Sequence, residues 1–323
     1  MVDLVVGHLK RNHLGSILPE IDSVDAVRNA RVATGLKADI LDLVWRHAGP
    51  ETLLSIGQSI REVEYDPIWH AAVRSADPAL LFDKWQRFEV FGHSQNRVEI
   101  EQIDEKHAAF RRYTVDGGTP AAPENLLICG LIIALLEEIG CLGLRCEMPL
   151  DNGAKHCIRQ DGRFALPHDP GRLATTSWTI GWRSQSLHLT KAASATELPD
   201  IAFSPSCAMS NRVLVGSVLR ALSLDVARQW KIDELARQAG LSARSLQRRL
   251  RESSQSFSRL VRLVRVHEAC RLLTNTSAPI TAIGFCAGFS DSAHFSRDFR
   301  ATIGMTPTEY RKVYNLPANS VPH

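Results

Sequence analysis

Two segments near the C-terminus place arginine and amide side chains on one face of a short helix. In residues 242–251 the outward positions are Arg244, Gln247, Arg248 and Arg251, at helical spacing. A guanidinium group donates two hydrogen bonds to guanine, and a glutamine amide pairs with adenine in the major groove. These residue types at this spacing predict a surface that reads DNA bases.

The residues around this basic helix are those of a helix-turn-helix. A preceding short helix has an apolar stripe at Ile232, Leu235, Ala236 and Ala239. Gly240 supplies a turn with positive φ at low steric cost, and Ser242 is a favourable N-cap for the basic helix. The inward positions of that helix are Leu246 and Leu250. We expect the two helices to pack through these apolar side chains.

A second copy of the same plan follows at about residues 280–301. Its turn falls at Gly288, and its second helix turns Phe295 and Phe299 inward. Three residues offer side-chain oxygens that can cap this helix: Ser290, Asp291 and Ser292. The helix exposes His294, Arg297 and Arg300. Two basic helices, each preceded by a glycine turn, predict two insertions into DNA major grooves.

A helix predicted over residues 258–273 connects the two copies. Its 16 residues correspond to a length of about 24 Å. A rod of this size can hold two recognition helices roughly one DNA turn apart, about 34 Å. A single chain would then read two adjacent major grooves.

The C-terminal segment from about residue 213 to residue 311 resembles the DNA-binding domain of the AraC/XylS transcription regulators. The second repeat carries the family signature at Ile280, Ile283, Gly288, Phe289, Phe295, Arg297, Phe299, Gly304, Pro307, Tyr310 and Arg311. The first repeat and the linking helix fit it at Leu235, Ala236, Gly240, Ser242, Leu246, Arg248, Arg265, Ala269 and Leu273. Two positions depart from the pattern, Ala282 and Gly284, and a glycine there is expected to loosen the helix by up to about 1 kcal/mol.

The resemblance implies DNA contacts residue by residue. In the first repeat Arg244, Gln247 and Arg248 align with base-facing positions, Ser245 aligns with a base or phosphate contact, and Arg251 lies on the same face. In the second repeat the groove-facing positions are Ser292, Ala293, His294 and Arg297. Ala293 suits a thymine methyl group. Arg300 and Lys312 are expected to contact phosphates, whereas Phe295, Phe299 and Tyr310 are expected to be core.

The charge of the chain is divided unevenly. Residues 211–323 contain 17 Lys/Arg and 8 Asp/Glu, a net charge of +9, and residues 1–210 have a net charge of −6. A basic C-terminal third attracts phosphate, which agrees with DNA binding. We expect three parts: a regulatory domain over 1–190, a linker over 191–206 that is rich in Ala, Ser, Thr and Pro, and a DNA-binding domain over 207–323.

The N-terminal part reads as an α+β domain. Residues 25–90 are mainly helical, and strands are predicted over 97–104 and 107–115. The run LLICGLIIALLEEIG is apolar nearly all round and must be buried, in the domain core or against another subunit, with the core favoured. Short strands are expected at 143–148, 155–160, 163–166 and 177–183. The predicted fold class is therefore an α+β domain joined to an all-α domain with two helix-turn-helix motifs linked by a long helix.

The α+β part resembles the effector or dimerisation domains of one branch of the same family. A small-molecule pocket there would be lined by Phe110, Tyr113, Trp178 and Trp182, and the alternative is that each is plain core. The cysteines are odd in number, and Cys129, Cys141, Cys146 and Cys157 are spaced poorly for zinc. No metal site or cofactor is expected. No catalytic or phosphate-binding signature is present, so no enzyme is expected, and a fused DNA-repair methyl acceptor would need a reactive cysteine site that is not visible.

These observations predict a transcription regulator that binds double-stranded DNA. The resemblance implies an activator that contacts RNA polymerase and is controlled by a small effector or by homodimerisation. The alternatives are a ligand-independent or thiol-redox-controlled regulator or repressor, and an architectural DNA binder. The chain has no membrane-length apolar run and too short an apolar N-terminal run for a signal peptide, so a cytoplasmic location is expected.

Overall fold

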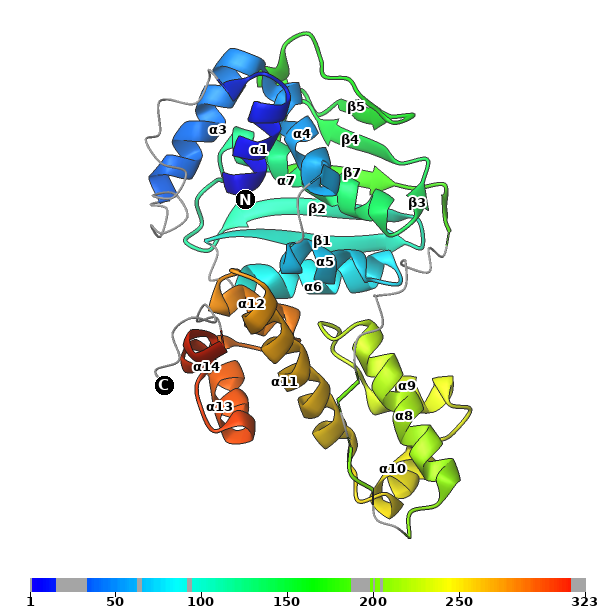
Figure 1. Cartoon of the computed structure of the whole chain (residues 1–323). Coiled ribbons are helices and arrows are strands. Elements are labelled where there is room, and N and C mark those ends of the chain that lie inside the picture. The colour runs from blue at the N-terminus through cyan, green and yellow to red at the C-terminus, as the bar shows by residue number, and fades with distance from the viewer. Residues whose placement is uncertain are drawn as a thin grey trace. The chain divides into compact units, whose positions relative to one another are not determined.

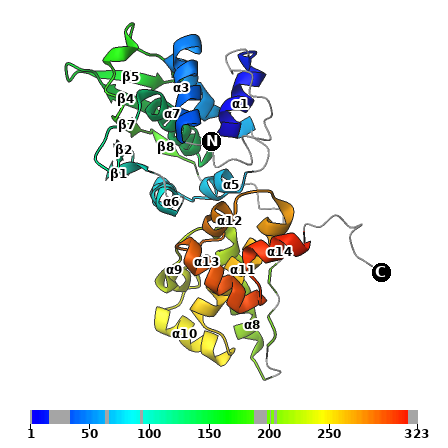
Figure 2. The same cartoon turned by 90° about the vertical axis from the view of Figure 1, so that its left-hand side faces the viewer.

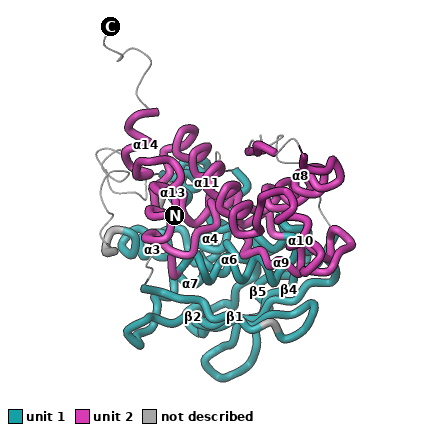
Figure 3. Tube along the Cα trace, turned by 90° about the horizontal axis from the view of Figure 1, so that it is seen from below, with its two compact units in different colours: residues 1–65, 76–89, 94–188 teal, residues 66–75, 90–93, 189–323 magenta. Residues whose placement is uncertain are grey.

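The computed structural model describes residues 2–15, 34–62, 66–91, 95–186, 198–199, 201–203 and 206–314. These residues form two compact units, shown in different colours in Figure 3. The first comprises residues 1–65, 76–89 and 94–188, and the second comprises 66–75, 90–93 and 189–323. The predicted domain over 1–190 was continuous, whereas residues 66–75 and 90–93 within it belong to the second unit. Most of the predicted linker lies outside the described residues.

A six-stranded antiparallel sheet forms the centre of the first unit. Its order is β1-β2-β7-β4-β5-β6. The strands are β1 (Asn96–Asp104), β2 (His107–Thr114), β4 (Arg145–Pro149), β5 (Lys155–Gln160), β6 (Arg163–Phe164) and β7 (Ser177–Gly181). A separate two-stranded sheet pairs β3 (Cys141–Leu142) with β8 (Ser184–Gln185). The turn between β5 and β6 is at Asp161-Gly162, where both residues have the positive φ that a two-residue hairpin needs.

The helices of the first unit lie on one face of this sheet (Figure 2). They are α1 (Val2–Arg11), α3 (Thr34–Ala48), α4 (Pro50–Gln58), a 3₁₀ turn (Ser59–Glu62), α6 (Pro78–Phe91) and α7 (Ala122–Glu138). In β2 the side chains of Ala108, Phe110 and Arg112 are buried, whereas those between them are more exposed. This alternation is what a sheet with one covered face requires.

Helix α7 is buried inside the unit, as predicted. Every residue from Asn125 to Leu136 is buried. It crosses α4 with the backbones almost touching, because a Cβ on Gly57 would lie 2.3 Å from Gly130 C, and a Cβ on Gly130 would lie 2.3 Å from Leu54 O. Glycines at this crossing let two apolar helices pack without side chains between them. Of the two predicted locations for this segment, the domain core and a contact with another subunit, the structure confirms the domain core.

The second unit is helical. Its C-terminal helices are α8 (Met209–Leu224), α9 (Ile232–Gln238), α10 (Ala243–Glu252), α11 (Phe257–Asn275), α12 (Ile280–Cys286), α13 (Ser292–Ile303) and α14 (Pro307–Tyr314). Figure 1 shows α8 to α10 at one end of α11 and α12 to α14 at the other. The short helix α5 (Pro67–Val73) belongs to this unit and packs on α12. The predicted fold class, an α+β part and an all-α part with two helix-turn-helix motifs joined by a long helix, is confirmed.

Candidate nucleic-acid interface

The first helix-turn-helix consists of α9 and α10. Gly240 turns the chain with φ of 65°, and Ser242 Oγ accepts a hydrogen bond from Ser245 N at 3.2 Å as the N-cap of α10. Leu246 and Leu250 are buried in one cluster with α8, α9 and α11. The predicted cap, turn and inward leucines of this motif are confirmed. The packing leaves the opposite face of α10 to solvent.

That outer face carries the predicted base-reading side chains. Arg244, Gln247, Arg248 and Arg251 are exposed, and Ser245 is half-buried. Within the described part of the chain, Arg244, Gln247 and Arg251 have no hydrogen-bond or ion-pair partner for their side chains. Three basic side chains and one amide are thus displayed along about two turns of helix. The amide and the two unpaired guanidinium groups are free to bind a nucleic acid.

Arg248 differs from its neighbours because its side chain is hydrogen-bonded within the protein. Its Nη1 donates to Glu252 Oε1 at 3.0 Å, and the other oxygen of that carboxylate accepts from Asn211 Nδ2, also at 3.0 Å. Asn211 lies on α8 and is buried. Glu252 and Asn211 were not predicted from the sequence. Glu252 could have been found from its spacing of four residues from Arg248 on one helix. No local signal in the sequence pointed to Asn211.

The second helix-turn-helix consists of α12 and α13. Gly288 has φ of 83°, and Asp291 Oδ1 accepts from His294 N at 2.7 Å as the N-cap of α13. Of the three predicted capping residues, Asp291 is therefore the cap. Ser292 lies inside the first turn, and its hydroxyl is buried with no hydrogen-bond partner among the described residues. Phe295 and Phe299 are buried against Phe289 and Tyr310, as predicted.

The outer face of α13 displays fewer free polar groups than that of α10. Ala293, Arg297 and Arg300 are exposed. His294 is half-buried, and its two ring nitrogens are already engaged, Nδ1 with Ser290 Oγ at 2.9 Å and Nε2 with Asp298 Oδ2 at 3.2 Å. A base contact from His294 therefore has to replace an internal hydrogen bond.

Asp298 is a further residue that was not predicted from the sequence. Its carboxylate also accepts from Arg262 Nε of α11 at 3.3 Å. The spacing of four residues from His294 was again a usable signal, whereas Arg262 comes from a separate helix. The pair joins the second reading helix to the linking helix.

The two motifs are braced against each other through the turn at Gly288. A Cβ at this position would lie 2.2 Å from the backbone oxygen of Val226, in the connection between α8 and α9. Gln229 Nε2 donates to Gly288 O at 3.0 Å, and Arg265 Nη2 of α11 donates to Gln229 Oε1 at 3.0 Å. Helix α11 has 19 residues, three more than predicted, and so spans about 28 Å. One rigid helix and one braced turn thus connect the two reading helices.

Gly284, which was expected to loosen α12, has a packing role in this structure. A Cβ on Gly284 would lie 2.7 Å from the ring of Phe295. The glycine lets the aromatic ring pack directly on the backbone of α12. Ala282 is buried as well. The two departures from the expected signature are therefore packing positions.

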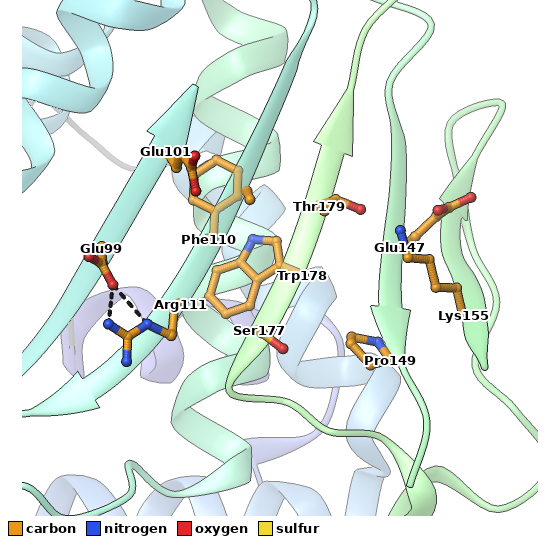
Figure 4. A pocket seen from close by; sticks show the side chains of 11 residues that line it. Glu99, Glu101, Phe110, Arg111, Glu147, Pro149, Lys155, Ser177, Trp178 and Thr179 are labelled. Atoms are coloured by element: carbon orange, nitrogen blue, oxygen red, sulfur yellow. Dashed lines mark hydrogen bonds and ion pairs between the residues drawn. The ribbon is translucent and has the colours of Figure 1, made fainter. Parts of the chain in front are cut away.

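The aromatic residues predicted to line a pocket in the first unit fall in different places. Phe110 and Trp178 are buried and stacked, with ring centroids 5.7 Å apart. They contribute to the wall of a pocket on the sheet (Figure 4). Trp182 is buried elsewhere in the core, and Tyr113 is partly exposed. Neither Trp182 nor Tyr113 lines this pocket.

The cysteines form no metal site within the described residues, where no group of three or more His, Cys, Asp or Glu could hold a metal ion. Cys129 Sγ on α7 and Cys146 Sγ on β4 lie 3.8 Å apart and are fully buried. Burial, together with the neighbouring Cys129 thiol, raises the pKa of Cys146 well above its ordinary value. Burial also raises the pKa of Cys141 to about 12. These environments disfavour the thiolate form, which is the reactive one.

Comparison with known proteins bears on the C-terminal part of the chain. Residues 235–313 match the family model described as a helix-turn-helix domain. The transcriptional activator PerA of Escherichia coli O127:H6 is 23% identical over 113 residues, 35% of this chain and 41% of that protein. The ornithine utilization regulator of Pseudomonas aeruginosa is 35% identical over 81 residues, 25% of this chain and 24% of that protein. The chain thus matches less than half the length of these relatives.

Among solved structures, an AraC-type DNA-binding regulator from Chromobacterium violaceum is similar at 26% identity and a TM-score of 0.32. The match covers 34% of this chain and 98% of that one. The two relatives named above are described as a transcriptional activator and a utilization regulator. No described helix is both long enough and apolar enough to cross a membrane.

Proposed function

We propose that this protein is a sequence-specific DNA-binding transcription regulator of the AraC type. Residues 235–313 match a helix-turn-helix domain, and the same part of the chain is similar to transcription regulators. The observation that carries the proposal is a single helical unit that holds two helix-turn-helix motifs together and turns the basic face of each reading helix to solvent. The net charge of +9 on residues 211–323 supports contact with phosphates.

The two motifs have unequal roles in this proposal. Helix α10 reads bases through Arg244, Gln247 and Arg248, with Ser245 and Arg251 at base or phosphate. Helix α13 reads through Ala293 and Arg297, assisted by His294, and Arg300 contacts phosphate. The predicted contact from Ser292 is withdrawn, because its hydroxyl is buried. Each helix enters one of two adjacent major grooves, and α11 sets their separation.

Activation is the proposed sign of regulation. PerA is named as a transcriptional activator, and an activator needs contact with RNA polymerase. The first unit is proposed to control the DNA-binding unit by binding a small effector, by forming a homodimer, or by combining the two. Effector binding would act by shifting the population of DNA-binding states.

The proposal is tested by selecting DNA sites for the full chain from a random library. The affinity for the selected site is then compared with that for a shuffled site at one fixed salt concentration. A specific regulator discriminates between them by about 10³ or more. Equal affinities would identify an architectural DNA binder and overturn the proposal.

A further inference from the structure

The linking helix α11 carries a basic surface of its own, in addition to the outer faces of α10 and α13. Arginines recur at every third position of its first half, at Arg259, Arg262 and Arg265. Arg265 is half-buried and donates to Gln229, so it belongs to the brace at Gly288. Arg259 and Arg262 are exposed, and we call these two residues the α11 pair.

No residue of α11 neutralises this pair. The one carboxylate in the helix is that of Glu268, which is buried and hydrogen-bonded to Arg271. Residues three apart on a helix are neighbours, and like charges at such positions destabilise the helix. In the described part of the chain, Arg259 has no ion-pair partner. An anion bound beside the α11 pair would therefore stabilise this part of the helix.

Each arginine of the pair is connected to one of the two reading motifs. Arg259 Nη1 donates to Ser254 O at 3.4 Å, in the turn that follows α10. Arg262 Nε lies 3.3 Å from Asp298 Oδ2, and His294 Nε2 of α13 lies 3.2 Å from the same oxygen. The α11 pair thus lies on the helix that separates α10 from α13, with contacts toward both (Figure 1).

The contact with Asp298 leaves Arg262 able to bind a second anion. The side chain of Arg262 is 55% exposed, whereas that of Asp298 is 24% exposed. The contact is through Nε, and a guanidinium group has four further N–H donors. The single charge of Asp298 is also shared with His294. Arg262 can therefore contact a phosphate while it stays beside Asp298.

The position of α11 determines which part of a duplex this pair would meet. Since α10 and α13 are proposed to enter two adjacent major grooves, the helix that joins them passes over the phosphate rows that border the minor groove between those grooves. Arg259 and Arg262 are about 4.5 Å apart along the helix axis. Successive phosphates of one strand are about 3.4 Å apart along the duplex axis, which is a similar spacing.

We propose that Arg259 and Arg262 bind the DNA phosphates that border this minor groove. The contacts hold the two motifs in register on the duplex and carry no sequence information, because the phosphates are alike at every position. This inference rests on the proposed DNA binding and not on its sequence specificity. It adds two phosphate contacts to the one proposed for Arg300.

The test measures the affinity of the purified full chain for the selected site and for a shuffled site at several salt concentrations, by fluorescence anisotropy. Loss of one phosphate contact lowers the magnitude of the slope of log K against log[salt] by about 0.9. Arg259→Gln and Arg262→Gln should each have this effect, and the double variant should lower the slope by about 1.8. Near 0.1 M salt, each single change should weaken binding to both duplexes by about fivefold to tenfold and leave the base preference unchanged.

Two further variants make the result specific. Arg220→Gln, at an exposed position of α8, removes the same charge and should leave the slope unchanged. Asp298→Asn removes the carboxylate that competes for Arg262, so it should raise affinity for both duplexes. If Arg262 only held α13 in place, Asp298→Asn and Arg262→Gln would instead lower the preference for the selected site alike, which would refute the phosphate contact of Arg262.

Unchanged slopes in Arg259→Gln and Arg262→Gln, with DNA binding retained, would overturn the proposal. A changed base preference between the two half-sites would assign the pair to minor-groove bases and would overturn it as well. Equal affinity of the unaltered chain for the two duplexes would contradict only the proposed sequence specificity, because the slopes can be measured on either duplex. An unaltered chain that binds neither duplex would contradict the proposed function itself.

Discussion

Arg248 donates to Glu252 one turn further along α10, with Nη1 and Oε1 3.0 Å apart. The same carboxylate is held from behind by Asn211 of α8. The side chain of Arg248, which is proposed to contact bases, is thereby oriented in the absence of DNA. The arrangement places a negative charge close to where the phosphate backbone would lie. An exposed ion pair of this kind contributes little to folding stability, so its proposed role is to limit the conformations of Arg248.

Replacing Arg248 by alanine should weaken binding to the selected DNA site by about 1–3 kcal/mol and relax the preference at one base position. Glu252→Gln should act differently. It removes a negative charge, so affinity for shuffled DNA should rise, and it frees Arg248, so the ratio of specific to non-specific affinity should fall. Fluorescence anisotropy on the two DNAs measures both quantities. Arg220→Ala, which removes an exposed charge from α8, is the control, and an equal loss of site preference there would refute the assignment.

The first motif should contribute more sequence specificity than the second. Arg297→Ala is expected to cost about 1–3 kcal/mol and to affect one base position. Arg244→Ala and Arg248→Ala together should relax more positions, because the polar groups of His294 are engaged within the protein. Site selection repeated with each variant measures the relaxed positions. A broader loss of preference in Arg297→Ala than in the double variant would contradict this ranking.

Gly288 and Gly240 form a matched pair of turns. Both have positive φ. A Cβ added to Gly240 would have no other atom within 4 Å, whereas a Cβ added to Gly288 would lie 2.2 Å from Val226 O. Gly240→Ala should therefore cost about 1–2 kcal/mol of unfolding free energy, from backbone conformation alone. Gly288→Ala should cost at least about 2 kcal/mol more, since the backbones must separate. Urea unfolding of the two variants tests this, and similar losses would show that the contact with Val226 is not rigid.

The cap of α13 should respond to acid. The hydrogen bond that Asp291 accepts from the backbone of His294, and then that from the Ser290 hydroxyl, lower the pKa of Asp291 below its ordinary value of 3.8. A lowered folded-state pKa means that the stabilisation is complete above the unfolded-state pKa and is lost as pH falls through the folded-state pKa. Amide exchange in the first turn of α13 should therefore accelerate in that acid range.

Asp291→Asn is the control for this acid response, because the amide oxygen still caps the helix and does not titrate. The exchange rate of the first turn should then be independent of pH in the same range, after correction for intrinsic chemistry. An identical acid response in the asparagine variant would exclude Asp291 as its source.

The buried thiols should be unreactive in the native protein. Because burial raises the pKa of Cys141 to about 12 and that of Cys146 well above its ordinary value, the thiolate is scarce near neutral pH. Iodoacetamide should label the partly exposed Cys157 before Cys129, Cys141 or Cys146, as read by peptide mass spectrometry. Labelling of Cys129 and Cys146 at the rate of Cys157, without unfolding, would favour the thiol-redox alternative for regulation.

The local features of the DNA-binding motifs could be predicted closely. Gly240, Gly288 and Ser242 act through their own backbone conformation or through a hydrogen bond within one turn, so nearby residues suffice to specify them. The inward leucines and phenylalanines follow from helical periodicity for the same reason. The N-cap of α13 could not be chosen between Asp291 and Ser292 from the sequence, because both residue types cap helices equally well. The hydrophobic packing of α13 decides between them.

The sequence alone determined that this chain has two helix-turn-helix motifs, which positions face outward on their second helices, and that the apolar run beginning at Leu126 is buried. These properties depend on spacing along the chain. Only the tertiary structure decided that Asn211 holds Glu252, that Gly288 lies against Val226, and that Arg262 of α11 pairs with Asp298 of α13. Each of these relationships joins segments far apart in sequence, and their packing depends on how whole helices and strands fit together. The exposed residues that are proposed to contact DNA could thus be predicted from the sequence, whereas the residues that hold them in place required the fold.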